Sequence, residues 1–349
     1  MKYLRILLIS VPLSFVGYFM NWNATTMFIL ACIAIIPLAG YLGSATESIA
    51  VYTGPKAGGF LNATFGNATE LIISFFAIRA GLFDVVKATL AGSVLGNILL
   101  VLGCSILAGG LKHKVLKYDA KLGRSTATML LFAVVALAMP AVFTAKIQED
   151  VIVGKYMTFS IITSIIMLIT YVVGVIYSFK SQNDLYDEKD EEEEAQWSLI
   201  ASTVILAVAT ILIAVESEFL VGSIEPMTEA AGISQMFIGI ILIPIIGNAA
   251  EHSTAIIMAL KNKMDIAIEI AVGSSLQIVL FVIPISVIMS LFISETPMSI
   301  VFKAGEIFLF GASVFIVNHI VKAGRTDWME GLKLISVYII AAVGFFMIG

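Results

Sequence analysis

Long apolar runs constrain this chain more than any other feature of its sequence. A helix needs roughly 17–25 apolar residues to cross a bilayer. Eleven stretches approach or exceed that length, at 4–20, 25–52, 57–79, 84–110, 122–146, 152–179, 197–230, 234–260, 265–293, 298–321 and 329–348. Only 13% of the residues are charged, where a soluble domain carries roughly a quarter. Because a helix satisfies its own backbone hydrogen bonds in lipid, the sequence predicts an all-α polytopic membrane protein with about 11 transmembrane helices.

The remaining charges are distributed unevenly. Residues 184–194 hold eight acids and one lysine, so this tract carries −7 within a chain of net charge −5. With the N-terminus in the cytoplasm, 15 of the 20 Lys and Arg residues fall on cytoplasmic segments, as the positive-inside rule requires. The tract is then cytoplasmic. We interpret it as a solvated linker, with a weak cation funnel or sensor as the alternative.

The chain also repeats itself. When the sequence is shifted by 181 residues, 66–105 matches 247–286 at 11 of 40 positions without a gap, including the unusual polar ones. Each half holds five spans, and an odd number inserts the second half upside down. We predict two inverted-topology five-helix repeats, which are typical of alternating-access transporters. The predicted segments are an extra N-terminal helix at 1–24, the first repeat at 25–179, the acidic linker at 180–196 and the second repeat at 197–349.

Two glutamates occupy equivalent places in these repeats. At about 1.5 Å per residue, Glu70 lies about 15 Å inside the third span, near the middle of a roughly 30 Å hydrocarbon core. Ser93 reaches the same level from the start of the next span, and Glu251 and Ser274 reach it from the opposite side. A carboxylate at this depth is costly without a partner. A dication relieves the cost for both glutamates, and so do protons.

The surrounding residues suit an ion with oxygen ligands. Ca2+ takes six to eight carboxylate, amide and backbone oxygens. The predicted ligands are Glu70, Glu251, Asn67, Asn248, Ser93, Ser274, Asn97 and Gln277. Gly66 and Gly247 precede the asparagines and would let each helix loosen, exposing backbone carbonyls to the ion. Protons would compete for the same two glutamates, which titrate as one unit, and His252 is a candidate proton relay.

Several of these residues have simpler explanations. The asparagines could only cap a helix break, and the serines could only permit close helix packing. His252 could be a satisfied polar side chain. Asp84 and Asp265 begin helices and are interpreted as N-caps. Glu47 and Glu225 lie on the two long spans that we expect to move as gates.

The motifs resemble a known family. GNATELI at 66–72 with GSVLGNILLVLG at 92–103, and GNAAEH at 247–252 with GSSLQIVLFVIP at 273–284, are similar to the two alpha-repeats of the Ca2+/H+ antiporter family. That family belongs to the Ca2+/cation antiporter superfamily. The resemblance implies an eleven-span fold in which Glu70 and Glu251 carry both Ca2+ and H+. Thr69 and Ala250 precede the glutamates where Na+/Ca2+ relatives typically have Pro in the first repeat, which favours the proton-coupled branch.

We therefore expect a secondary transporter that expels cytosolic Ca2+ in exchange for H+, and not an enzyme. The alternatives are a Na+- or K+-coupled Ca2+ exchanger of the same superfamily and a cation channel. The chain has no H-E-x-x-H zinc motif and no Walker or dinucleotide loop, so we expect no cofactor, with Ca2+ as the transported substrate. The predicted partners are Ca2+, H+ and the lipid bilayer, without nucleic acid, and a second copy of the chain in a homo-oligomer is a further candidate. Short loops suggest a bacterial inner membrane.

Overall fold

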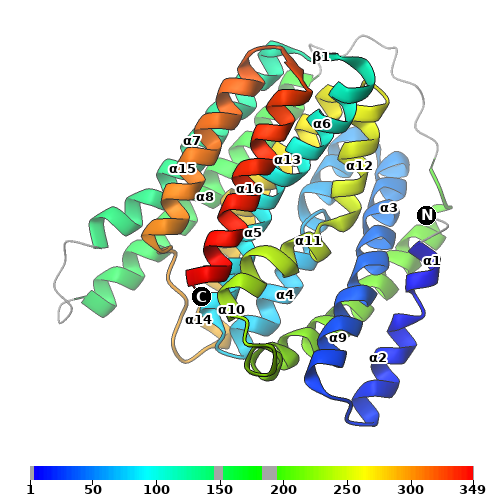
Figure 1. Cartoon of the computed structure of the whole chain (residues 1–349), viewed down its shortest axis with the longest axis vertical. Coiled ribbons are helices and arrows are strands. Elements are labelled where there is room, and N and C mark those ends of the chain that lie inside the picture. The colour runs from blue at the N-terminus through cyan, green and yellow to red at the C-terminus, as the bar shows by residue number, and fades with distance from the viewer. Residues whose placement is uncertain (1–3, 145–151, 183–194, 349) are drawn as a thin grey trace.

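The computed structural model describes residues 4–144, 152–182 and 195–348 (Figure 1). In the first half of the chain the helices are α1 (Leu4–Leu7), α2 (Ser10–Phe19), α3 (Ala24–Phe65), α4 (Ala68–Arg79), α5 (Phe83–Leu95), the π-helix η1 (Gly96–Val101), α6 (Leu102–His113), α7 (Ala120–Thr144) and α8 (Ile152–Gln182). In the second half they are α9 (Leu199–Ala231), α10 (Gln235–Phe237), η3 (Ile238–Leu242), α11 (Ile243–Gly247), α12 (Ala249–Leu260), α13 (Met264–Gln277), η4 (Ile278–Val282), α14 (Ile283–Ile293), α15 (Ala304–Lys322) and α16 (Trp328–Ile348).

These helices confirm the predicted all-α membrane class. Within the described residues, seven helices are long and apolar enough to cross a bilayer, and an eighth span is possible if the bent pair Gln235–Gly247 and Ala249–Leu260 counts as one. Two shorter apolar helices, Arg5–Phe19 and Ala127–Phe143, add to these. The exact count of eleven stays a prediction, and the acidic tract at 184–194 lies outside the described residues.

The predicted boundary between the second and third spans is confirmed, and the third span is broken. Ala24–Gly54 forms one long apolar helix that matches the predicted span at 25–52, whereas the predicted span at 57–79 is interrupted, because α3 ends at Phe65 and α4 begins at Ala68. Within α3 the chain bends at Gly54, whose φ of 83° is a conformation that favours glycine. The third span is therefore assembled from the end of α3 and from α4.

Helices α3 and α9 lie side by side along one edge of the molecule, with α2 next to them (Figure 1). Tyr52 donates a hydrogen bond to the carbonyl of Trp197 at one end of this pair, and the ring of Tyr41 stacks on the same tryptophan. Helices α7, α8 and α15 form the opposite edge, and α4, α5, α11, α12 and α13 occupy the middle. The middle layer contains both motifs that the repeats share.

The two halves carry the same irregularity in their middle layer. η1 interrupts the path from α5 to α6, and η4 interrupts the path from α13 to α14. Residues 97–101 and 278–282 correspond under the shift of 181 residues that aligns the motifs. π-Helical turns are rare and frequently lie at functional sites. The shared position supports the predicted duplication.

A short ribbon ties the loops together at one end of the bundle. β1 (Val115–Lys117) pairs antiparallel with β2 (Arg325–Asp327). Directly after β1, the hydroxyl of Tyr118 donates a 2.6 Å hydrogen bond to the buried carbonyl of Ile320. Burial raises the pKa of Tyr118 to about 12, so this hydroxyl keeps its proton at physiological pH.

Replacing Tyr118 with Phe should destabilise the ribbon without affecting transport. The change removes the hydroxyl hydrogen bond to the Ile320 carbonyl, which keeps the N–H of Ala323 as a partner, and the loss of one such bond costs about 0.5–1.5 kcal/mol. We expect a lower thermal unfolding midpoint in detergent. Tyr177, whose side chain is 71% exposed, supplies the matched control Tyr177→Phe. Equal midpoints for the two variants would contradict the assignment.

Candidate functional site

The site begins where two helices break. Asn67 interrupts the chain between α3 and α4 with φ −110° and ψ 26°, and Asn248 interrupts α11 and α12 with φ −98° and ψ 9°. The second break bends the chain by 61°. Glu70 and Glu251 lie in the first turn of the helices that follow. Each carboxyl therefore sits at the positive end of a helix dipole.

The asparagines do not serve as helix caps. Neither Asn67 nor Asn248 makes a side-chain cap hydrogen bond; each reaches across to the other repeat. Asn248 Nδ2 donates to Ser93 Oγ at 3.1 Å, and Asn67 Oδ1 accepts from Ser274 Oγ at 3.3 Å. These two contacts are equivalent under the 181-residue shift, and all four residues are buried. The breaks and serines of the two repeats therefore form one interlocked centre.

A further chain of hydrogen bonds extends this centre. Asn67 Nδ2 donates to Gln277 Oε1, and Asn97 Nδ2 donates to Ser274 Oγ at 3.1 Å. His252 Nε2 lies 3.1 Å from Asn97 Oδ1 and donates to it. Six of the eight predicted ligands thus take part in two separate hydrogen-bonded groups. One group is Asn248 with Ser93, and the other contains Asn67, Gln277, Ser274 and Asn97. His252 binds Asn97 rather than a carboxylate, so its predicted proton-relay role stays a prediction.

The two carboxylates complete the centre. Glu70 lies near Asn248, and Glu251 lies near Ser274. Glu251 also lies within electrostatic reach of Glu70 and of Glu47 on α3. Glu70 Oε1 and Glu251 Oε2 are buried and have no hydrogen-bond partner among the described residues. Each oxygen needs a proton or a cation, because an unpaired charge in a low-dielectric interior is costly.

The two glycines border the centre. A methyl group added at Gly247 would stand 3.7 Å from Glu70 Oε1, and one added at Gly66 would stand 3.6 Å from Gln277 Oε1. Their lack of side chains leaves the space in front of these oxygens open. Whether their backbone carbonyls also bind an ion stays a prediction.

The donor set favours a hard cation. Among the described residues, no three His, Cys, Asp or Glu side chains gather as a metal site. The centre instead offers two carboxylates with amide and hydroxyl oxygens. Oxygen ligands of this mixed kind suit Ca2+ better than the transition metals.

Asp84 and Asp265 were predicted to be N-caps, and this was wrong. The N-cap positions of α5 and α13 are Leu82 and Lys263, without side-chain caps. Asp265 Oδ1 accepts from the backbone N–H of Asp119 across the bundle, and Asp84 pairs with Lys303 at 3.1 Å. First-turn acids can bind outside their own helix when a neighbouring segment presents a donor.

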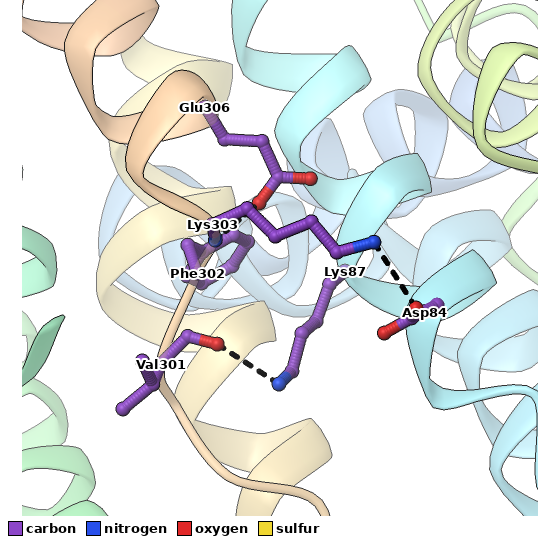
Figure 2. A pocket seen from close by; sticks show the side chains of 6 residues that line it. All are labelled: Asp84, Lys87, Val301, Phe302, Lys303 and Glu306. Carbon is purple, nitrogen blue, oxygen red and sulfur yellow. Dashed lines mark hydrogen bonds and ion pairs between the residues drawn. The ribbon is translucent and has the colours of Figure 1, made fainter. Parts of the chain in front are cut away.

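Figure 2 shows the hollow beside Asp84, at the far end of α5 from Ser93. Lys87 Nζ donates to Val301 O at 2.9 Å, and Glu306 Oε2 accepts from the backbone N–H of Lys303 at 2.8 Å. The charged side chains that line the hollow therefore already have partners within the protein. These contacts join α5 to α15, and the hollow is separate from the Glu70–Glu251 centre.

Replacing Asn67 with Ala should weaken ion binding. The change removes the hydrogen bonds to Ser274 and Gln277, each worth about 1 kcal/mol, and we expect the half-saturating Ca2+ concentration to rise roughly 10- to 30-fold. Transport assays at graded Ca2+ measure it. Asn62→Ala, at an exposed position near the end of α3, is the control. An unchanged half-saturation for Asn67→Ala would remove this residue from the site.

A mostly helical, multi-span chain with two carboxylates brought together from equivalent helix breaks has the architecture of an ion exchanger. The sequence profile of the sodium/calcium exchanger protein family matches residues 23–180 and 201–347, and the chain belongs to this family.

Relatives extend along its whole length. It is 44% identical to the "Ca(2+)/H(+) antiporter ChaA" of Bacillus subtilis (strain 168) over 345 residues, 97% of both chains. It is 41% identical over 365 residues to the "Ca(2+)/H(+) antiporter" of Synechocystis sp., covering 99% of this chain and 97% of the relative. The solved structure titled "Structure of native YfkE" superposes with a TM-score of 0.86 at 42% identity, covering 99% of each chain.

One buried acid of the second half was missed by the sequence reasoning. Glu216 on α9 is fully buried, yet no repeat motif marks it. Its signal was a carboxyl inside an apolar span, which is a functional hypothesis by default.

Proposed function

We propose that this protein is a secondary active transporter that exchanges Ca2+ for H+ across a membrane and thereby extrudes cytosolic Ca2+. The observation that carries the proposal is the pair of buried carboxyl oxygens, Glu70 Oε1 and Glu251 Oε2, which lack partners among the described residues. Full-length similarity to proteins named Ca2+/H+ antiporters supports the choice of ions.

Exchange follows from competition for one site. Two bare carboxylates close together are costly in a low-dielectric interior. One Ca2+ or protons on both groups remove that cost, so either load permits the closed centre to form. An empty, doubly charged centre resists closure. Because only a centre loaded with Ca2+ or protons closes, the movements of the two ions are coupled without any covalent chemistry. The protein therefore acts as a transporter and not as an enzyme.

The centre also has unequal access from its two sides. A methyl group at Gly92 would overlap the carbonyl of Ile240, so α5 closes tightly on η3. At Gly273, the equivalent glycine of α13, no described atom lies within 4 Å of the added methyl. Glu70 is 3% exposed, whereas Glu251 is half-buried. This asymmetry supports alternating access, with the gap beside α13 open and the one beside α5 closed.

The setting follows from the same proposal. We place the protein in a bacterial cell membrane with the N-terminus in the cytoplasm, on the strength of the 15 of 20 Lys and Arg residues that this orientation puts inside. Homo-oligomerisation and a regulatory role for the acidic tract at 184–194 stay predictions.

Reconstitution into liposomes tests the proposal. We expect an imposed pH gradient alone to drive Ca2+ movement against its own gradient, in buffers without Na+ or K+. Ca2+ flux that requires Na+ or K+ would show that the protein is a Na+- or K+-coupled Ca2+ exchanger instead. Ca2+ flux whose rate does not depend on H+, Na+ or K+ would indicate a channel and contradict exchange.

A further inference from the structure

A second buried carboxyl centre lies apart from the Glu70–Glu251 pair. Glu216 on α9 is fully buried beneath α2, the helix of the predicted N-terminal extension. Ser14 on α2 is also fully buried, and its Oγ lies 2.5 Å from Glu216 Oε1. The second oxygen, Oε2, is buried without a hydrogen-bond partner among the described residues.

The hydrogen bonds of Ser14 identify the protonation state of this carboxyl. Ser14 Oγ lies 2.6 Å from the carbonyl oxygen of Val11 as well as 2.5 Å from Glu216 Oε1. A hydroxyl has one proton to donate, and a backbone carbonyl has none. When Ser14 donates to Val11, the proton between Ser14 and Glu216 has to come from the carboxyl. A neutral carboxylic acid then satisfies both short contacts, whereas a carboxylate would have to share one hydroxyl proton with the carbonyl.

The electrostatic surroundings favour the same state. The nearest charged groups on α9 and α4 are Glu218 and Arg79, which pair with each other at 3.7 Å. Helix α2 contributes only Tyr18 as an ionisable group, and α3 contributes Cys32 and Tyr41 but no charge between Ala24 and Thr46. Glu70 is the other ionisable group of α4. Among the described residues no ion pair involves Glu216, and Arg79 is engaged by Glu218.

Apolar contacts surround the Glu216 carboxyl and hold α2 in place. The ring of Phe219, one turn beyond Glu216, stacks on Tyr18 at 4.7 Å and meets Phe15 edge-on at 5.7 Å. Ser10 and Gly17 continue the buried face of α2 on either side of Ser14. An ionised Glu216 would place an unbalanced charge beneath this face, and the cost would be relieved by α2 moving away so that water reaches the carboxylate.

We propose that Glu216 is a separate proton-binding site, at which one proton joins the N-terminal helix α2 to the long helix α9. Binding of the proton docks α2, and its loss releases α2. Because α9 is one of the two helices expected to move during transport, the proton would restrain that motion from outside the ion centre. The proposal does not depend on which ions are transported.

Infrared difference spectroscopy tests whether the proton is present. We use the full-length protein carrying Glu70→Gln and Glu251→Gln, so that the ion-centre carboxyls do not contribute. A carbonyl-stretch band of a protonated carboxyl should appear, disappear in Glu216→Gln, and remain in Glu218→Gln. Ser14→Ala should shift the band by removing the acceptor, which serves as a second readout if Glu216→Gln folds poorly. No band difference with Glu216→Gln and no shift with Ser14→Ala would overturn the proposal.

Labelling of a buried thiol tests whether the proton docks α2. In a background with Cys32→Ala and Cys104→Ala, Ser10→Cys places a thiol on the buried face of α2. The labelling rate with Glu216 is divided by the rate with Glu216→Gln at each pH, which cancels the ionisation of the thiol itself. The ratio should rise with pH, by at most about tenfold per pH unit for one linked proton. A ratio that stays constant across the pH range would show that Glu216 does not control docking.

Discussion

Replacing Glu70 or Glu251 with Gln is expected to abolish Ca2+/H+ exchange while leaving the protein folded. The amide keeps the size of the carboxyl but loses its charge and cannot carry the exchanged proton. Two unit charges at 4 Å interact with about 4 kcal/mol at an effective dielectric constant near 20. Loss of one such interaction weakens cation binding on the order of 10³-fold, and a dication loses more.

The measurement is pH-driven Ca2+ uptake into liposomes that contain equal amounts of folded protein. Glu229→Gln, at an exposed position near the end of α9, is the matched control and should transport normally. Thermal unfolding separates loss of function from loss of structure. Removing an unpaired buried carboxylate should leave the variants at least as stable as the parent at neutral pH. Strong pH-driven uptake by either variant would refute the assigned ion centre.

The predicted ion centre rests on an internal duplication, which places the same residue types at the same depth twice. Asn67 and Ser93 are 26 residues apart, as are Asn248 and Ser274. Helix rise and inverted insertion alone predict that Ser93 and Ser274 reach the depth of Glu70 and Glu251. The structure adds the contacts of Asn248 with Ser93 and of Asn67 with Ser274.

Other features depend on packing that a single sequence does not encode locally. Ser14 and Glu216 are 202 residues apart and share no motif, so their contact follows from where α2 docks. Asp265 resembles an N-cap in sequence, but α13 begins at Met264, and the Asp265 carboxylate accepts from the N–H of Asp119 in another loop.

Replacing Gly92 or Gly273 with Ala should slow exchange severely. The two glycines occupy equivalent positions in the two repeats, and we expect each substitution to disfavour a different one of the two conformations. In the described conformation, the Gly92 methyl overlaps the Ile240 carbonyl, while the Gly273 methyl meets no described atom within 4 Å. Gly92→Ala should therefore disfavour this conformation, and Gly273→Ala should leave it intact.

The inverted repeats predict what happens in the other conformation. There α13 would close on the segment at 57–61, which corresponds to η3 under the 181-residue shift, and α5 would open. The Gly273 methyl would then collide where the Gly92 methyl collides now. Overpacking of this kind costs about 1–3 kcal/mol, which shifts the balance between the two conformations by roughly 5- to 150-fold. Because every transport cycle visits both conformations, either bias slows the cycle.

Thiol accessibility distinguishes the two directions of bias. Single cysteines along Gly43–Ala50 on α3 and Gly222–Thr228 on α9, in a background without Cys32 and Cys104, report which side of the centre is open. Gly92→Ala should lower the labelling of positions that are open in the parent protein and raise that of closed ones, and Gly273→Ala should do the reverse. Alternating access by two equivalent repeats would be contradicted if thiol accessibility shifted in the same direction in both variants. It would also be contradicted if accessibility did not change with pH or with Ca2+. The Glu70–Glu251 centre would then have to load its ions without the exchange of conformations that the pairing of Gly92 with Gly273 predicts.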